Sequence, residues 1–114
     1  IVRIVRLHFH EDQVSTFLEI FSGHRERIRH FPGCTRLELH RDPDHPSTFA
    51  TISHWQSAAD LENYRQSPLF KEVWGKVKPL FRLRSEAFTL EKVDEVLSLY
   101  IPLTDRLCAT HCLH

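Results

Sequence analysis

The stretch SHWQSAADLENYRQSPLFKEVWGKVKPLF, residues 53–81, decides the fold because it contains two closely spaced helix starts. Ser57, with Asp60 three residues later, resembles a capping box whose acidic arm is short. Ser67 followed by Pro68 is typical of an N-cap with proline at the first helical position, where its missing N–H removes no hydrogen bond. The stretch therefore predicts two short helices in succession.

The second of these helices carries a single apolar stripe. After Pro68, large apolar residues recur at helical spacing on one face: Phe70, Val73, Trp74, Val77 and Phe81. Pro79 disfavours helical geometry at Lys78, so we expect the helix to end there. Gly75 lies inside the helix at a cost of about 1 kcal/mol relative to alanine, which predicts close packing against that position.

The residues before this stretch predict a strand and a longer helix. Residues 1–10 (IVRIVRLHFH) alternate, and one face of this strand combines Arg3 with apolar residues. Apolar spacing from Val14 predicts an amphipathic helix to about Arg29, with Asp12 as its cap. The Phe-Pro-Gly sequence at 31–33 ends that helix.

A hairpin and a last strand complete the pattern. Residues 34–41 alternate, residues 48–55 are rich in β-branched and aromatic residues, and the turn at 42–46 (DPDHP) joins them. Residues 83–90 predict the last strand. The order β-α-β-β-α-β is that of the ferredoxin-like fold in the α+β class, an antiparallel sheet with both helical segments on one face. The other face must then meet water or a partner.

Length and composition indicate one domain over residues 1–90, followed by a C-terminal extension or tail at 91–114. The 15 basic and 15 acidic residues balance, which argues against nucleic-acid binding. No apolar run approaches the roughly 20 residues of a membrane span. The three cysteines, Cys34, Cys108 and Cys112, form no even disulfide framework, and no signal-peptide pattern precedes them. We therefore expect a reducing, cytoplasmic compartment.

Three motifs resemble the antibiotic biosynthesis monooxygenase (ABM) family, over about residues 1–90. They are the strand IVRIVRLHF entering a helix, WQSAADL at 55–61 and YRQSPLF at 64–70. The resemblance implies a homodimer in which two sheets pack into an α/β barrel, with a pocket between each sheet and its own helices. Members of the family include cofactor-free oxygenases of polycyclic phenols, quinol oxygenases and haem-degrading enzymes.

The haem-degrading branch has an Asn on the first strand, a Trp in the short helix and an iron-ligating His in the next helix. By the shared motif, this sequence has Val5, Tyr64 and Trp74 at those positions. All three differ, and an indole does not ligate iron, so we expect no haem degradation.

The candidate site residues are aromatic, with one histidine. Tyr64 is the first catalytic candidate, because a tyrosine hydroxyl can hydrogen-bond a phenolic oxygen while its ring stacks on the substrate. His54 is the second, as a general base, although strand alternation places it opposite Trp55. The substrate-binding candidates are Trp74, Trp55, Phe70 and Phe21. Ordinary core packing is the alternative for Tyr64 and Trp74, and a structural role is the alternative for His54.

No metal site is predicted. His8 and His10 have a spacing that can hold a metal, but only the distant His40 offers a third ligand. Cys108 and Cys112, with the neighbouring histidines of the tail, match no zinc motif.

Three function hypotheses follow. The first is a cofactor-independent monooxygenase of a phenol or quinol, which needs only a dry aromatic pocket and a base or hydrogen-bond donor. The second is a non-catalytic dimeric module that binds a small aromatic molecule. The third, haem binding or degradation, is disfavoured by the replaced positions.

Overall fold

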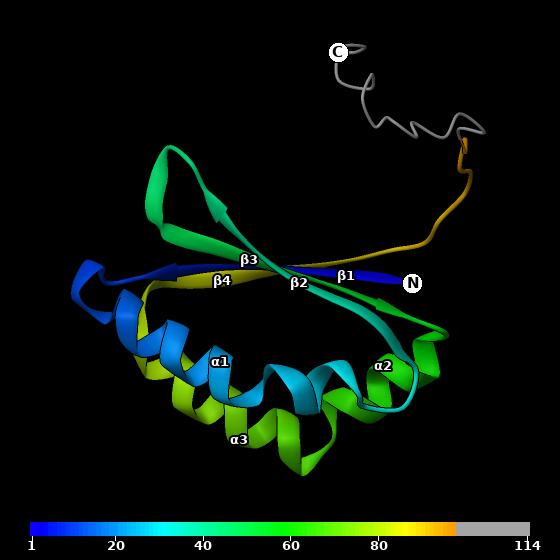
Figure 1. Ribbon diagram of the computed structural model, residues 1–114, viewed down its shortest axis with the longest axis horizontal. Helices are drawn as coiled ribbons and strands as arrows, with labels where there is room; N and C mark the ends of the chain where they lie inside the picture. Colours follow the sequence, from blue (N-terminus) through cyan, green and yellow to red (C-terminus); the bar gives the residue numbers. More distant parts are fainter. Residues whose placement is uncertain (98–114) are drawn as a thin grey trace, which may run out of the picture.

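The computed structural model describes residues 1–97 and shows a four-stranded antiparallel sheet with its helices on one face (Figure 1). The strands are β1 (Val2–Phe9), β2 (Cys34–Asp42), β3 (His45–Trp55) and β4 (Phe81–Leu90). The helices are α1 (Val14–Arg29), α2 (Ala58–Arg65) and α3 (Pro68–Val77), with short 3-10 turns η1 (Glu11–Gln13) and η2 (Lys78–Leu80).

The strands lie in the order β2-β3-β1-β4, so the first strand and the hairpin's second strand are central. This arrangement confirms the ferredoxin-like α+β fold predicted from the element order. The register pairs Ile4 with both Ile52 and Phe88, and these side chains share one face of the sheet. The neighbouring residues of each strand, such as Arg3 and Val5, face the helices instead.

Both predicted helix starts are confirmed. The Ser57 Oγ accepts a hydrogen bond from the Asp60 N–H at 3.1 Å. The Ser67 Oγ accepts one from the Phe70 N–H, also at 3.1 Å, and proline occupies the first turn of α3. Each bond satisfies a backbone donor that the start of a helix leaves free, so two helices can begin within a few residues of one another.

Some local expectations were wrong. Asp12 does not cap α1, because it lies inside η1 and the N-cap position falls to Gln13, which makes no side-chain cap bond. The hairpin turn is shorter than predicted, since β2 continues to Asp42 and β3 begins at His45. Gly75 has no close neighbour, because a Cβ built there would meet nothing within 4 Å.

The α3 stripe also ends sooner than its apolar spacing suggested. The α-helix stops at Val77, next to the predicted end. The predicted reason was wrong, because Lys78 keeps helical dihedrals (φ -54°, ψ -41°) and begins η2. Pro79 has no N–H to continue the α-helical ladder, so the chain tightens into a 3-10 turn there. Phe81, the last apolar residue of the stripe, is the first residue of β4, yet it still packs against the core.

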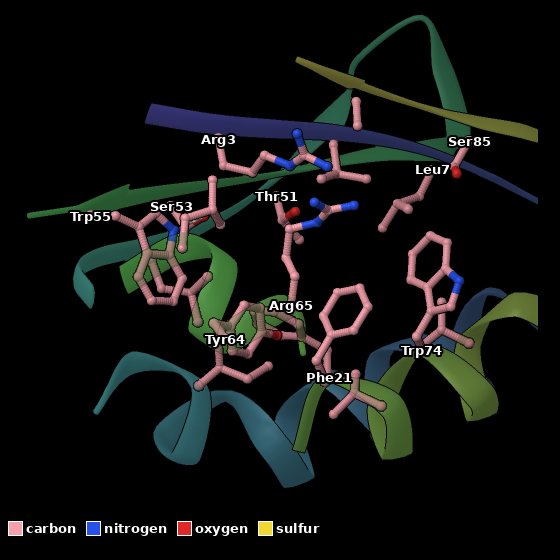
Figure 2. Close-up of a pocket in the computed structure, with 18 of the residues that line it drawn as sticks. Arg3, Leu7, Phe21, Thr51, Ser53, Trp55, Tyr64, Arg65, Trp74 and Ser85 are labelled. Carbon is pink, nitrogen blue, oxygen red and sulfur yellow. Dashed lines mark hydrogen bonds between the residues drawn. The ribbon is translucent and has the colours of Figure 1, made fainter. Parts of the chain in front are cut away.

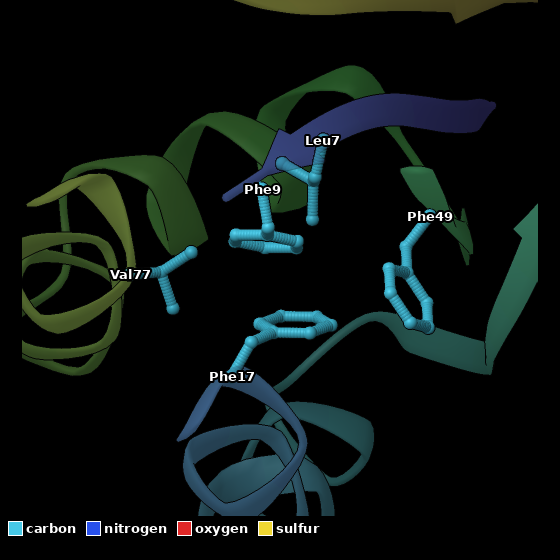
Figure 3. Packing of buried hydrophobic residues seen from close by; sticks show 5 residues of the cluster. All are labelled: Leu7, Phe9, Phe17, Phe49 and Val77. Atoms are coloured by element: carbon cyan, nitrogen blue, oxygen red, sulfur yellow. The ribbon is translucent and has the colours of Figure 1, made fainter. Parts of the chain in front are cut away.

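The main core is a phenylalanine cluster formed by Leu7, Phe9, Phe17, Phe49 and Val77 (Figure 3). Phe9 and Phe17 are 0% and 2% exposed, and their rings stack with centroids 4.2 Å apart. The cluster joins two central strands to α1 and the end of α3, which fixes one end of the sheet–helix interface.

A second cluster lies at the other end of the strands. This tryptophan–tyrosine cluster consists of buried Cys34, Trp55 and Leu61, with Phe31 and Tyr64 packed against them. It joins the start of β2 and the end of β3 to α2.

Residues 91–97 follow β4 without helix or strand. The remainder of the predicted extension, including Cys108 and Cys112, lies outside the described residues. Within residues 1–97, no helix is both long and apolar enough to cross a membrane.

Candidate functional site

A cavity of about 310 Å³ lies between the inward face of the sheet and the helices, flanked by the two clusters (Figure 2). All four strands and all three helices contribute to its wall. The alternation of β1 brings Arg3, Val5 and Leu7 to the same face, and the alternation of β3 does the same for Thr51, Ser53 and Trp55. The wall is mostly apolar with a few polar groups, the usual character of a small-molecule site.

Tyr64 lines the cavity from α2 and is held between aromatic rings. Its ring stacks on Trp55 with centroids 5.1 Å apart and meets Phe31 and Phe70 edge-on, each at 5.3 Å. Burial raises the pKa of Tyr64 to about 12, with a smaller contribution from the Cys34 thiolate charge. The phenol therefore stays protonated at neutral pH and can donate a hydrogen bond. Within residues 1–97 its hydroxyl makes no hydrogen bond, so its donor is free for a ligand.

Trp55 is almost fully buried and its polar atom is already satisfied. The indole N–H donates to the Ser53 Oγ at 2.9 Å. This bond leaves the Ser53 hydroxyl proton available on a wall that is otherwise largely carbon. Trp55 thus supplies shape to the cavity, and Ser53 supplies a second polar group beside Tyr64.

The other aromatic candidates line the helical side. Trp74 stacks on Phe70 at a centroid distance of 5.9 Å with the planes 11° apart, and it meets Phe81 edge-on at 5.4 Å. Phe21 lines the cavity from α1. Trp74 and Phe70 are half-buried, so part of each ring faces open space rather than protein.

His54 is separated from these residues. It precedes Trp55 on β3, pairs with Val2 of β1, and lies on the sheet face turned away from the helices. It does not line the cavity. The structure therefore brings together five of the predicted site residues, namely Tyr64, Trp74, Trp55, Phe70 and Phe21, and leaves His54 on the far side of the sheet.

Two arginines in the cavity wall were absent from the sequence-based candidates. Arg3 reaches in from β1 and Arg65 from the end of α2. The sequence held a signal for Arg3, since it shares the inward face of β1 with Val5, Leu7 and Phe9. Arg65 gave no such signal, because an arginine at the end of a helix is usually a solvated partner of the helix dipole.

Two of the three histidines considered for metal binding, His8 and His40, contact other side chains. His8 lies within hydrogen-bond distance of Thr48 and Glu86, at 3.1 and 3.0 Å. His40 is on β2, two strands away from β1, and contacts Glu38 at 2.8 Å. Within residues 1–97, no three side chains of the metal-ligating types come together. The positions compared with the haem-degrading branch, Val5, Tyr64 and Trp74, all line the cavity.

Solved structures with the same fold are numerous. Rv0793 of Mycobacterium tuberculosis superposes with a TM-score of 0.77 at 20% identity, covering 84% of this chain and 97% of that one. A crystal structure of an antibiotic biosynthesis monooxygenase gives 0.75 at 17% identity, covering 82% and 100%. A conserved protein of Methanosarcina mazei gives 0.72 at 17% identity, covering 76% and 87%. At these identities the likeness shows the fold alone.

A search of curated protein sequences found no match. The family model described as antibiotic biosynthesis monooxygenase matches residues 1–74, which hold β1 to α2, most of α3 and most of the cavity wall. The chain therefore belongs to the antibiotic biosynthesis monooxygenase family.

Proposed function

We propose that the cavity binds a small phenol or quinol and that the protein is a cofactor-independent monooxygenase of that molecule. The observation that carries the proposal is the free Tyr64 hydroxyl in an aromatic wall. An aromatic ring in the cavity can pack against the wall formed by Tyr64, Phe70 and Trp74, and the tyrosine can donate to its oxygen. Family membership supports oxygenase chemistry as the reaction class.

The reaction balances without a further reductant. A phenol or quinol that has lost a hydroxyl proton carries electron density on the ring carbons opposite and adjacent to that oxygen, and one of these carbons that bears a hydrogen forms a bond with O₂. The O–O bond then breaks, one oxygen stays on that carbon in the quinone product, and the other leaves as water with the two substrate protons. The substrate loses four electrons and O₂ gains four. The protein's part is to bind the ring, exclude water and stabilise the phenolate oxygen.

One observation favours the second hypothesis, a non-catalytic binding module. His54 faces away from the cavity, and the described wall contains no histidine or carboxylate that could act as a base at neutral pH. Tyr64 is protonated and is a donor rather than a base. Catalysis by this cavity must therefore work by stabilising a phenolate, whereas a binding protein needs no proton acceptor at all.

Oxygen uptake against a panel of hydroquinones and anthrone-like phenols separates the two hypotheses. Tyr64→Phe keeps the ring and removes only the hydroxyl. We expect little change in the free energy of unfolding. Substrate binding should weaken, or the activation barrier should rise, by about 1–3 kcal/mol, roughly 5- to 150-fold in affinity or rate. Thr35→Val is the control, because it removes a hydroxyl that bonds the His54 carbonyl outside the cavity.

Oxygen uptake that survives Tyr64→Phe unchanged would contradict the role given to the hydroxyl. Ligand binding without any oxygen uptake across the panel would favour the binding module. A strong destabilisation of the unliganded protein by Tyr64→Phe, with activity intact, would make Tyr64 a structural residue.

We also propose that the protein is a homodimer through the outer face of its sheet. That face exposes Phe88 and Leu90, 50% and 52% exposed, beside Ile4 and Val2. A contiguous apolar patch of this kind is typical of an interface, and a two-fold dimer would bury it on both subunits. Light scattering should give twice the chain mass, and Phe88→Glu should give the monomer mass. A stable monomer of the unmodified chain at micromolar concentration would refute the dimer.

A further inference from the structure

Arg3 brings a charge into the cavity that no carboxylate of residues 1–97 contacts directly. Its guanidinium donates to the neutral Thr89 hydroxyl at 2.7 Å, and it forms no salt bridge with any carboxylate of residues 1–97. Burial lowers the pKa of Arg3, and the nearby charge of Arg65 lowers it further, against a smaller opposing effect of Glu62. A partly buried charge without a counter-charge is costly for a fold to keep.

Arg65 adds a second positive charge at the same place. Figure 2 shows its guanidinium rising from α2 into the space where the Arg3 guanidinium also lies, next to Thr51. Its acidic partner is Glu62, at 3.0 Å, and that carboxylate also accepts from the Gln66 side chain at 2.8 Å. Glu62 is exposed and already shared, so the pair of arginines keeps an excess of positive charge.

The rest of the wall cannot supply the missing charge. The described lining contains two arginines and no aspartate or glutamate, and its other polar groups are neutral hydroxyls and indole N–H groups. Guanidinium groups form forked, charge-assisted hydrogen bonds with carboxylates, which are stronger than bonds between neutral groups. Such an anion would relieve the repulsion between the arginines and replace the water that either group loses on burial.

We propose that the natural ligand is an aromatic acid whose carboxylate is held between Arg3 and Arg65 while its ring lies against Tyr64, Phe70 and Trp74. The inference rests on the proposed function, because it assigns the substrate class of that same cavity. The arginine pair is then the specificity element, and Thr51 and Ser53 offer hydroxyls beside it.

Calorimetry with hydroxynaphthoate, which carries its phenol and carboxylate on neighbouring carbons, and with its neutral methyl ester tests the inference on the full chain. We expect the acid to bind more tightly than the ester. Arg3→Gln and Arg65→Gln should each weaken binding of the acid by roughly 10- to 100-fold, which is the contribution of a charge-assisted hydrogen bond. The affinity for the ester should not change. Arg3→Lys, which keeps the charge, should recover part of the loss. Arg82→Gln is the control, since Arg82 is exposed on β4 and does not line the cavity.

Equal binding of acid and ester, or arginine variants with unchanged affinity for the acid, would overturn the inference and leave the aromatic site standing. Failure of both compounds to bind the unmodified protein would overturn the proposed function as well. Thermal melts of each variant separate a lost contact from a lost fold. Arg3→Gln removes an unbalanced charge, so its melting temperature should not fall.

Discussion

The phenylalanine cluster and the tryptophan–tyrosine cluster lie at opposite ends of the same sheet–helix interface, with the cavity between them. In the first, Phe9, Phe17 and Phe49 pack ring against ring and are almost fully buried. In the second, Trp55 is buried but Tyr64 and Phe31 are only half-buried. For Tyr64 the difference follows from chemistry, because a tyrosine hydroxyl must keep access to a partner, whereas the carbon-only rings of the first cluster can close an interior.

The contrast predicts which substitutions cost most stability. The largest loss should come from the phenylalanine cluster, where the interface is closed. Phe9→Ala should reduce the unfolding free energy by about 3–5 kcal/mol, since the ring is fully buried and the structure around a cavity relaxes only partially. Urea denaturation measures the loss. Phe70→Ala, at a half-buried ring of the cavity wall, is the comparison and should cost less. Equal losses would mean that the cavity end is as much a core as the phenylalanine cluster.

A substitution of Gly33, next to the tryptophan–tyrosine cluster, should give the second largest loss of stability. Gly33 has a φ of 92°, and an added Cβ would collide with the Asp60 side chain of α2. Gly33→Ala should therefore destabilise by about 1–3 kcal/mol from backbone strain, with the collision adding to it. Denaturant unfolding tests the stability, and the near-ultraviolet signal of Trp55 and Tyr64 tests whether α2 shifts. An unchanged midpoint would show that this end adapts freely.

The contact between α1 and α3 beneath the cavity should make the stability of the protein depend on pH in the acid range. Hydrogen bonds from His24, Arg27 and Lys76, at 3.2, 3.3 and 3.4 Å, hold the pKa of Glu72 at about 2, below its usual value. A carboxyl group whose pKa is lowered in the folded state stabilises the fold at pH values above its unfolded pKa, near 4.3. This contribution is lost as the pH falls from there toward about 2. The ion pair between α1 and α3 should therefore matter at neutral pH and vanish in acid.

Glu72→Gln tests this contribution by its difference from the unmodified protein. The difference in urea midpoint should be present at pH values above about 5 and should shrink to nothing near pH 2. Glu19→Gln, at an exposed residue of α1, is the control. A difference that does not depend on pH would mean that Glu72 acts by shape and hydrogen bonding alone.

The smallest expected change is a gain in stability. Gly75 lies in α3 with open space around its Cα, so Gly75→Ala should stabilise by up to about 1 kcal/mol through better helix propensity. Thermal unfolding measures it, and Gly33→Ala provides the opposite sign at a matched substitution. A loss of stability at Gly75 would indicate that this helix face is covered, for example by a partner.

The candidate site was predictable to the extent that its residues carry a local pattern. Tyr64, Phe70 and Trp74 were found because they belong to the motif and the stripe of one short stretch. Arg65 was not found, because its nearness to Arg3 joins positions 62 residues apart, which no local pattern records. The Gly75 expectation failed for a related reason, since helix propensity says nothing about what a neighbouring element leaves open.

The sequence by itself determined the elements and their order. Ser57 and Ser67 begin α2 and α3, and alternation separates Trp55 from His54, because capping and the pleat act within a few residues. Only the tertiary structure decided that the interface closes around Phe9 and stays open beside Tyr64, and that two arginines share that opening. The size of a cavity and the distance between two buried charges depend on how the sheet and the helices pack, so neither can be read from a local stretch of sequence.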